Sequence, residues 1–104
     1  MSKRYVIDCR ELWEQVVGEP GGMRAVHMWL RLHGISPDVV PLDSEMVIED
    51  SAFGMVIRYT AFLLNEDGRK YYDPAGEDAA SQARTAVLRF APEPRWLSTA
   101  GGER

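Results

Sequence analysis

The spacing of apolar and polar positions predicts a first helix over residues 9–17. Its apolar residues fall at i, i+3, i+4, i+7 and i+8, namely Cys9, Leu12, Trp13, Val16 and Val17. At 3.6 residues per turn this spacing places all five on one face, with polar residues on the other. Asp8 precedes the helix as a capping residue and Glu11 follows three positions later, as in a capping box. The glycines and proline of residues 18–22 end the helix.

A second helix is predicted from about Met23 to His33, with Gly34 as its C-terminal cap. Its polar residues share one narrow stripe at 100° per residue: Arg24, His27 and Arg31. Nearly every other position is apolar. A helix that is apolar around so much of its circumference lies between two layers or meets a partner.

The remainder of the chain has the pattern of strands. Residues 3–9 predict a short first strand, and residues 37–40 predict one helical turn. A short strand over 46–48 is expected to end at the polar residues 49–51. Residues 53–64 alternate over a long, β-branched and aromatic segment that is typical of a strand.

Residues 65–68, with the sequence Asn-Glu-Asp-Gly, carry a strong turn signal. Residues 69–73 are therefore expected to return as the partner of the long strand. A loop over 74–82 is expected to contain a helical turn at 77–80, before a last strand over 83–91.

Together these elements predict an α+β fold, with two N-terminal helices packed on a mostly antiparallel sheet of about four to five strands. The length of 104 residues fits a single small domain. We expect this domain to span residues 1–97, with a mobile C-terminal tail over 98–104.

Composition narrows the class of protein. The net charge of -4 opposes non-specific binding to nucleic acid and anionic lipid. No apolar run is long enough for a signal peptide or a membrane span. The single cysteine, Cys9, excludes an intramolecular disulfide and favours a cytoplasmic location. Ten arginines against two lysines indicate GC-rich codons, and hence an origin in a high-GC bacterium or a phage of such a bacterium.

Candidate catalytic groups are few. Cys9 lies on the apolar face of its helix, which is typical of a buried, unreactive thiol. His27 and His33 point about 120° apart on a straight helix and cannot share a metal. The acidic residues between Gly34 and Ile57 lack the spacing of a calcium loop. The sequence therefore predicts a protein that is not an enzyme and uses no metal and no cofactor.

The second helix is the candidate binding surface, and its candidate interface residues are Arg24, Met28, Trp29, Arg31 and Leu32. Trp, Met and Arg are enriched at the centres of protein interfaces, and Trp29 is the expected anchor. The leading hypothesis is a small accessory or inhibitor-like module that binds another protein. The alternatives are a homodimer or larger homo-oligomer formed through this helix or an open sheet edge, and weak nucleic-acid binding through the Arg24, His27 and Arg31 stripe.

Residues His33 to Asp43, which read HGISPDVVPLD after an Arg/Trp/Leu-rich helix, resemble a helix–turn–strand segment of small uncharacterised actinobacterial and actinophage proteins. Together with that helix, the likeness covers about a fifth of the chain. It implies a shared lineage and a small accessory role without catalysis, and it assigns no functional residue.

Overall fold

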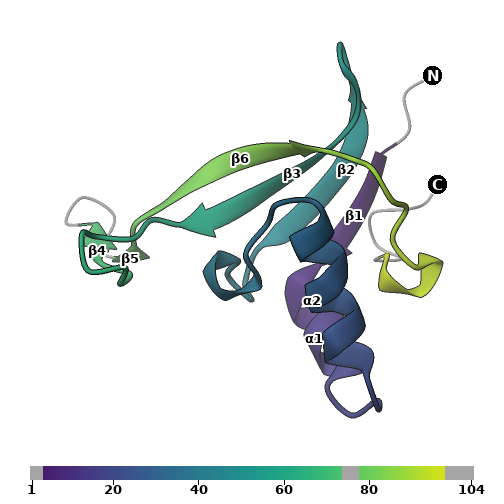
Figure 1. The fold of residues 1–104 in the computed structure, drawn as a ribbon, viewed down its shortest axis with the longest axis horizontal. Coiled ribbons are helices and arrows are strands. Elements are labelled where there is room, and N and C mark those ends of the chain that lie inside the picture. Colours follow the sequence, from purple (N-terminus) through teal and green to yellow (C-terminus); the bar gives the residue numbers. More distant parts are fainter. Residues whose placement is uncertain (1–3, 74–77, 98–104) are drawn as a thin grey trace.

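The computed structural model describes residues 4–73 and 78–97, and it shows two helices and a four-stranded antiparallel sheet, whose first strand precedes the helices and whose other strands follow them (Figure 1). This arrangement confirms the predicted α+β fold. The helices are α1 (Cys9–Val16) and α2 (Gly22–Leu32), with short 3-10 turns η1 (Pro37–Val39) and η2 (Pro94–Trp96). The strands are β1 (Arg4–Asp8), β2 (Glu45–Ser51), β3 (Gly54–Phe62), β4 (Tyr72–Asp73), β5 (Asp78–Ala79) and β6 (Ser81–Val87).

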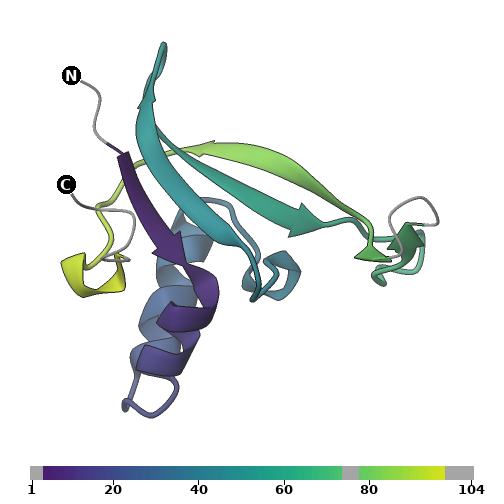
Figure 2. The same cartoon turned by 180° about the vertical axis from the view of Figure 1, so that it is seen from behind.

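Both helices begin and end at residues that the sequence marks. The Asp8 carboxylate accepts a hydrogen bond from the Glu11 backbone N–H at 3.1 Å, which caps α1. Gly22 starts α2 against the end of α1, where a β-carbon would lie 2.7 Å from the Val16 carbonyl oxygen. Gly34 ends α2 with a φ of +74°, in the left-handed region that favours glycine. The two helices lie side by side on one face of the sheet (Figure 2).

The main sheet has the strand order β1-β2-β3-β6, and all its neighbours are antiparallel. The expected break at residues 49–51 is wrong, because β2 continues to Ser51 and turns directly into β3. Glu49 and Ser51 share with Val47 the strand face without helices, where Glu49 forms ion pairs with Arg4 and Arg58. The tight turn that follows leaves Phe53 at its tip, 87% exposed.

The partner of β3 is also different from the prediction. Asn65 and Gly68 form the expected turn, but the returning chain reaches only an isolated bridge between Leu64 and Lys70. The long strand instead pairs with β6, over seven residue pairs that place Ala86 beside Ile57 on the helix-covered face. This longer register satisfies more backbone groups than a short return strand could.

The segment after the turn differs in two further ways. Residues 78–79 form β5, which pairs with β4, so the helical turn expected at 77–80 is wrong at these positions. The last strand begins at Ser81 and ends at Val87, whereas 83–91 was predicted. Residues 74–77 and the expected tail at 98–104 lie outside the described residues.

The hydrophobic core lies between the helices and the sheet face that they cover. Its largest fully buried side chains are Ile7, Val16, Ile35, Met46, Ile48 and Ile57. Trp96 of η2 is buried with them. The core therefore joins both ends of the described chain to α2.

Candidate functional site

The side of α2 that faces the protein interior holds the end of the chain in place. Trp29 is only 6% exposed, and its indole N–H donates a hydrogen bond to the Phe90 carbonyl oxygen at 2.8 Å. The prediction that Trp29 anchors an interface is wrong in this respect, since its ring is already covered by the protein's own chain. The helical spacing placed Trp29 among apolar positions, but it did not indicate which part of the molecule would pack against this side chain.

His33 makes a second set of contacts with the same segment. Its Nδ1 lies 2.8 Å from the Trp29 carbonyl oxygen, and its Nε2 lies 3.0 and 3.1 Å from the backbone nitrogens of Arg89 and Phe90. A carbonyl only accepts and a backbone N–H only donates, so Nδ1 carries the proton and Nε2 accepts. Sequence reasoning treated His33 only as a metal or catalytic candidate and missed this structural role.

Ring contacts and an ion pair extend this attachment. The Trp29 ring meets the Trp96 ring edge to face at 6.0 Å between centroids, and the His33 and Phe90 rings are 5.9 Å apart. On the surface, the Arg95 guanidinium contacts both carboxylate oxygens of Glu19, at 2.7 and 2.8 Å. We call residues 88–97 the C-terminal strap, because these contacts fix the segment to α2, to His33 at its end and to the loop before it.

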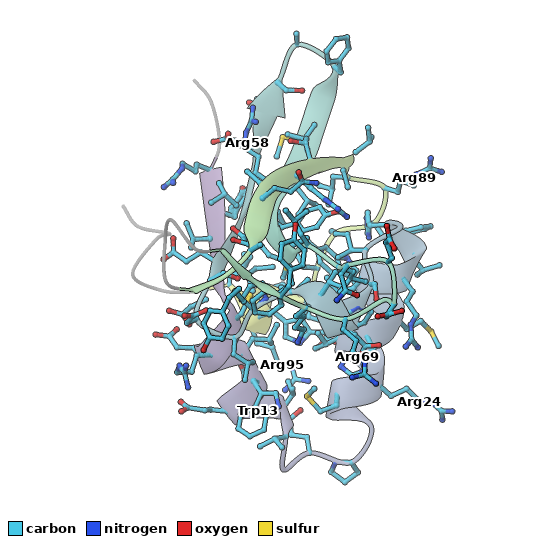
Figure 3. The ribbon with its side chains drawn as sticks, turned by 90° about the vertical axis from the view of Figure 1, so that its left-hand side faces the viewer. Trp13, Arg24, Arg58, Arg69, Arg89 and Arg95 are labelled. Atoms are coloured by element: carbon cyan, nitrogen blue, oxygen red, sulfur yellow. The ribbon has the colours of Figure 1, made fainter. Side chains whose placement is uncertain are left out.

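The outward side of α2 has a different character. Met28 is 56% exposed and Leu32 is 53% exposed, one turn apart on the helix surface. Arg24 and Arg31 are exposed beside them, and Figure 3 shows Arg24 extending away from the body of the protein. Neither arginine forms an ion pair with another described residue. These four residues, together with His27, line one shallow hollow, which we call the α2 outer face.

The residues of α2 follow a fixed order around the helix axis. At 100° per residue, Leu30 and Met23 point toward α1, and the basic stripe follows over about 60°. The basic stripe consists of His27, Arg31 and Arg24, in that order. Met28 and Leu32 come next, on the far side of the stripe. The helix contains no Asp or Glu.

An apolar groove lies on the other side of this stripe, between α1, α2 and the η1 region. It encloses about 310 Å³, with Cys9 and Met46 at its floor and Trp13 and Leu42 exposed at its rim. His27 lines both this groove and the α2 outer face, so the two hollows are neighbours. The sequence did not predict the groove, because it depends on how far apart the two helices pack.

Cys9 is a structural residue of the groove floor. Burial raises the pKa of its thiol, against a smaller opposing effect of the hydrogen bond from the Ser44 hydroxyl. The protonated thiol is a poor nucleophile, which agrees with the interpretation of Cys9 as a core residue. Among the described residues, no three His, Cys, Asp or Glu side chains are grouped so that they could hold a metal ion.

Comparisons with known proteins add nothing further. No protein-family model, no curated protein and no solved structure matches this chain. Over the part of the chain that the structure describes, no helix has the length and apolar character needed to cross a membrane.

Proposed function

We propose that this protein is a small non-enzymatic module that binds another protein through the α2 outer face. The observation that carries the proposal is the combination, on one rigid helix, of two exposed apolar side chains with two arginines that pair with no described residue. Met and Arg are the types of residue that protein interfaces favour, and a helix holds them at low cost in conformational entropy.

Other exposed apolar residues support the proposal by contrast. Phe53 lies at a hairpin tip, and Val87 lies on β6 at the edge of the sheet, 55% exposed. Each is a single large apolar side chain exposed on its turn or strand, as is common on protein surfaces. On α2, by comparison, two exposed apolar residues lie one turn apart and share one hollow with two arginines that pair with no described residue.

Charge complementarity defines the chemistry of the partner. The α2 outer face is basic, whereas the chain as a whole carries a net charge of -4. A partner with an acidic surface is therefore steered toward α2 and repelled from most of the remaining surface. The same net charge disfavours nucleic acid, which is the other polyanion that a basic helix could bind.

The test is affinity capture of a partner, followed by measurement of its affinity. Tagged wild-type protein, a Met28→Ser/Leu32→Ser double variant and a Val87→Ser control are incubated with a nuclease-treated lysate of a high-GC bacterium. A protein captured at near-stoichiometric yield is identified by mass spectrometry, purified and titrated. We expect the double variant to weaken its binding by about 30-fold, the equivalent of about 2 kcal/mol at an interface centre, and the control to leave it unchanged.

A partner that binds the wild type and the double variant equally well would overturn the proposal. So would a partner that loses affinity only with Val87→Ser, because its contact would then lie on the sheet. Both variants must show the wild-type unfolding midpoint before the titrations are compared.

A further inference from the structure

We infer, on the basis of the proposed function, that the partner presents an acidic amphipathic helix, which lies across the basic stripe and places apolar side chains in the groove between α1 and α2. The proposed function requires only the α2 outer face. The further step is that the groove belongs to the same binding surface and that its occupant is a helix.

The first argument is continuity. His27 borders both hollows, so a segment that covers Met28 and Leu32 needs only to cross the basic stripe to reach the groove. The groove volume of about 310 Å³ lies at the low end of the range for ligand sites, about 300–1,000 Å³. A space of this size suits a few apolar side chains better than a large cofactor.

The second argument is the order in which apolar and basic residues follow one another across the surface. The groove is apolar, the stripe is basic, and Met28 and Leu32 are apolar again. An occupant that matches this order has acidic residues flanked by apolar ones. Because α2 has no Asp or Glu and its arginines form no ion pair with described residues, the counter-charge must come from the partner.

The third argument concerns the backbone of the occupant. The groove walls are side chains of two helices, such as Leu12 and Leu30, whose helical backbone groups are already hydrogen-bonded. An extended segment would find no strand edge here with which to pair its own N–H and C=O groups. A helix satisfies these groups internally and can present apolar residues at i, i+3, i+4 and i+7.

A second copy of this chain fits the surface poorly. Its α1 has already buried the apolar residues Leu12 and Val16 in its own core. Its α2 would place arginines against arginines in a symmetric pair. At α1 and its C-cap, Trp13 and Val17 are the large apolar residues left exposed, with Arg10 as well as Glu14 beside them, so this helix offers two apolar side chains rather than a full amphipathic face.

The experiment is selection of a displayed library of random 16-residue peptides on the immobilised wild-type protein. Enriched peptides are synthesised and titrated against five proteins: the wild type, Arg24→Glu/Arg31→Glu, Leu42→Asp, Met28→Ser/Leu32→Ser and a Phe53→Asp control. Leu42 lies at the exposed groove rim, and Phe53→Asp makes the same change of charge at the hairpin tip. Circular dichroism measures whether the peptides gain helix on binding.

We expect enriched peptides with Asp or Glu between apolar residues at helical spacing, and helix formation on binding. Affinity should fall at least tenfold with Arg24→Glu/Arg31→Glu and with Leu42→Asp, and should stay within twofold of wild type with Phe53→Asp. All variants are first checked for wild-type circular dichroism and unfolding midpoint.

Other outcomes separate the two proposals. Peptides that respond to Met28→Ser/Leu32→Ser but not to Leu42→Asp, or that carry no acidic residues, overturn the helix-in-groove inference and leave the proposed function standing. The absence of enriched peptides, or enrichment of peptides that bind as extended chains, also overturns the inference. Peptides indifferent to every substitution on α2 count against both. A peptide-free dimer in sedimentation that Leu42→Asp dissociates would make a second copy the occupant.

Discussion

The two sides of α2 belong to the same helix, yet they differ in how many of their side chains are buried or have a bonding partner within the protein. On the inner side, the side chains of Trp29 and His33 meet the C-terminal strap through three hydrogen bonds. On the outer side, Met28 and Leu32 are more than half exposed, and the arginines beside them pair with no described residue. The contrast teaches that apolar character alone does not separate a core position from a binding position.

Substitutions on the two sides should therefore have opposite consequences. A change on the inner side should lower the free energy of unfolding, and a change on the outer side should alter binding and leave that free energy nearly unchanged. The following predictions test this division, beginning with the largest expected effect on stability.

The largest effect is expected for Trp29→Ala. The substitution leaves a cavity between α2 and the strap and removes the indole N–H donor to Phe90, so we expect a loss of about 3–5 kcal/mol in the free energy of unfolding. Chemical denaturation followed by circular dichroism measures the loss. Trp13→Ala, at an exposed position of α1, is the control and should cost less than half as much. Equal losses would remove the distinction between the two tryptophans.

A smaller loss is expected for His33→Phe. The ring volume is retained, but the backbone N–H groups of Arg89 and Phe90 lose their acceptor, at a cost of about 2 kcal/mol. Hydrogen exchange at these two amides should speed up with the loss of stability. His27→Phe makes the same chemical change on the outer side, and we expect it to shift stability by no more than about 0.5 kcal/mol.

The pH dependence of stability at Cys9 tests whether the groove floor is shielded from solvent. Since burial raises the pKa of its thiol, the folded state holds the proton more tightly than the unfolded state. This contribution to stability is fully present below the unfolded thiol pKa, about 8.5, and is lost as the pH rises through the higher folded value. Denaturation curves at neutral and alkaline pH should thus show a steeper decline for the wild type than for Cys9→Ala. Parallel declines would mean that the thiol is solvated.

The smallest effect on stability is expected for Met28→Ser and Leu32→Ser. Both side chains are already exposed, so each change should alter the free energy of unfolding by no more than about 0.5 kcal/mol. Thermal unfolding of the single variants measures this directly. A loss of more than about 1.5 kcal/mol in the free energy of unfolding for either variant would show that the outer side contributes to the core. The proposed difference between the two sides of α2 would then be wrong.

Local patterns predicted the fold well where one short segment sufficed. The apolar spacing of α1 and α2, the Asp8 cap and the Gly34 end are all properties of a few neighbouring residues. The partner of β3 could not be predicted this way, because the turn at residues 65–68 favours a local return that the longer register with β6 outcompetes.

The candidate site was predictable only in part. Helical periodicity identified the stripe of Arg24, His27 and Arg31. Because these residues share one face of α2, they line the same hollow. The same periodicity gave no means of separating Trp29 from Met28, since both lie on an apolar helix and only the distant strap decides which is covered. The role of His33 depends on backbone groups 56 and 57 residues further along the chain, and the sequence around His33 gives no indication of this contact.

That separation along the chain has a consequence during synthesis. A protein is made from its N-terminus, so α2 leaves the ribosome well before residues 88–97 have been added. Until the strap arrives, Trp29 lacks its hydrogen-bond acceptor at Phe90 and its contact with Trp96, and His33 has no peptide donors for Nε2. The nascent chain thus exposes on α2 an aromatic surface that the finished protein conceals. A chain that stops after Val87 would keep this surface open and be a natural target for chaperones and proteases.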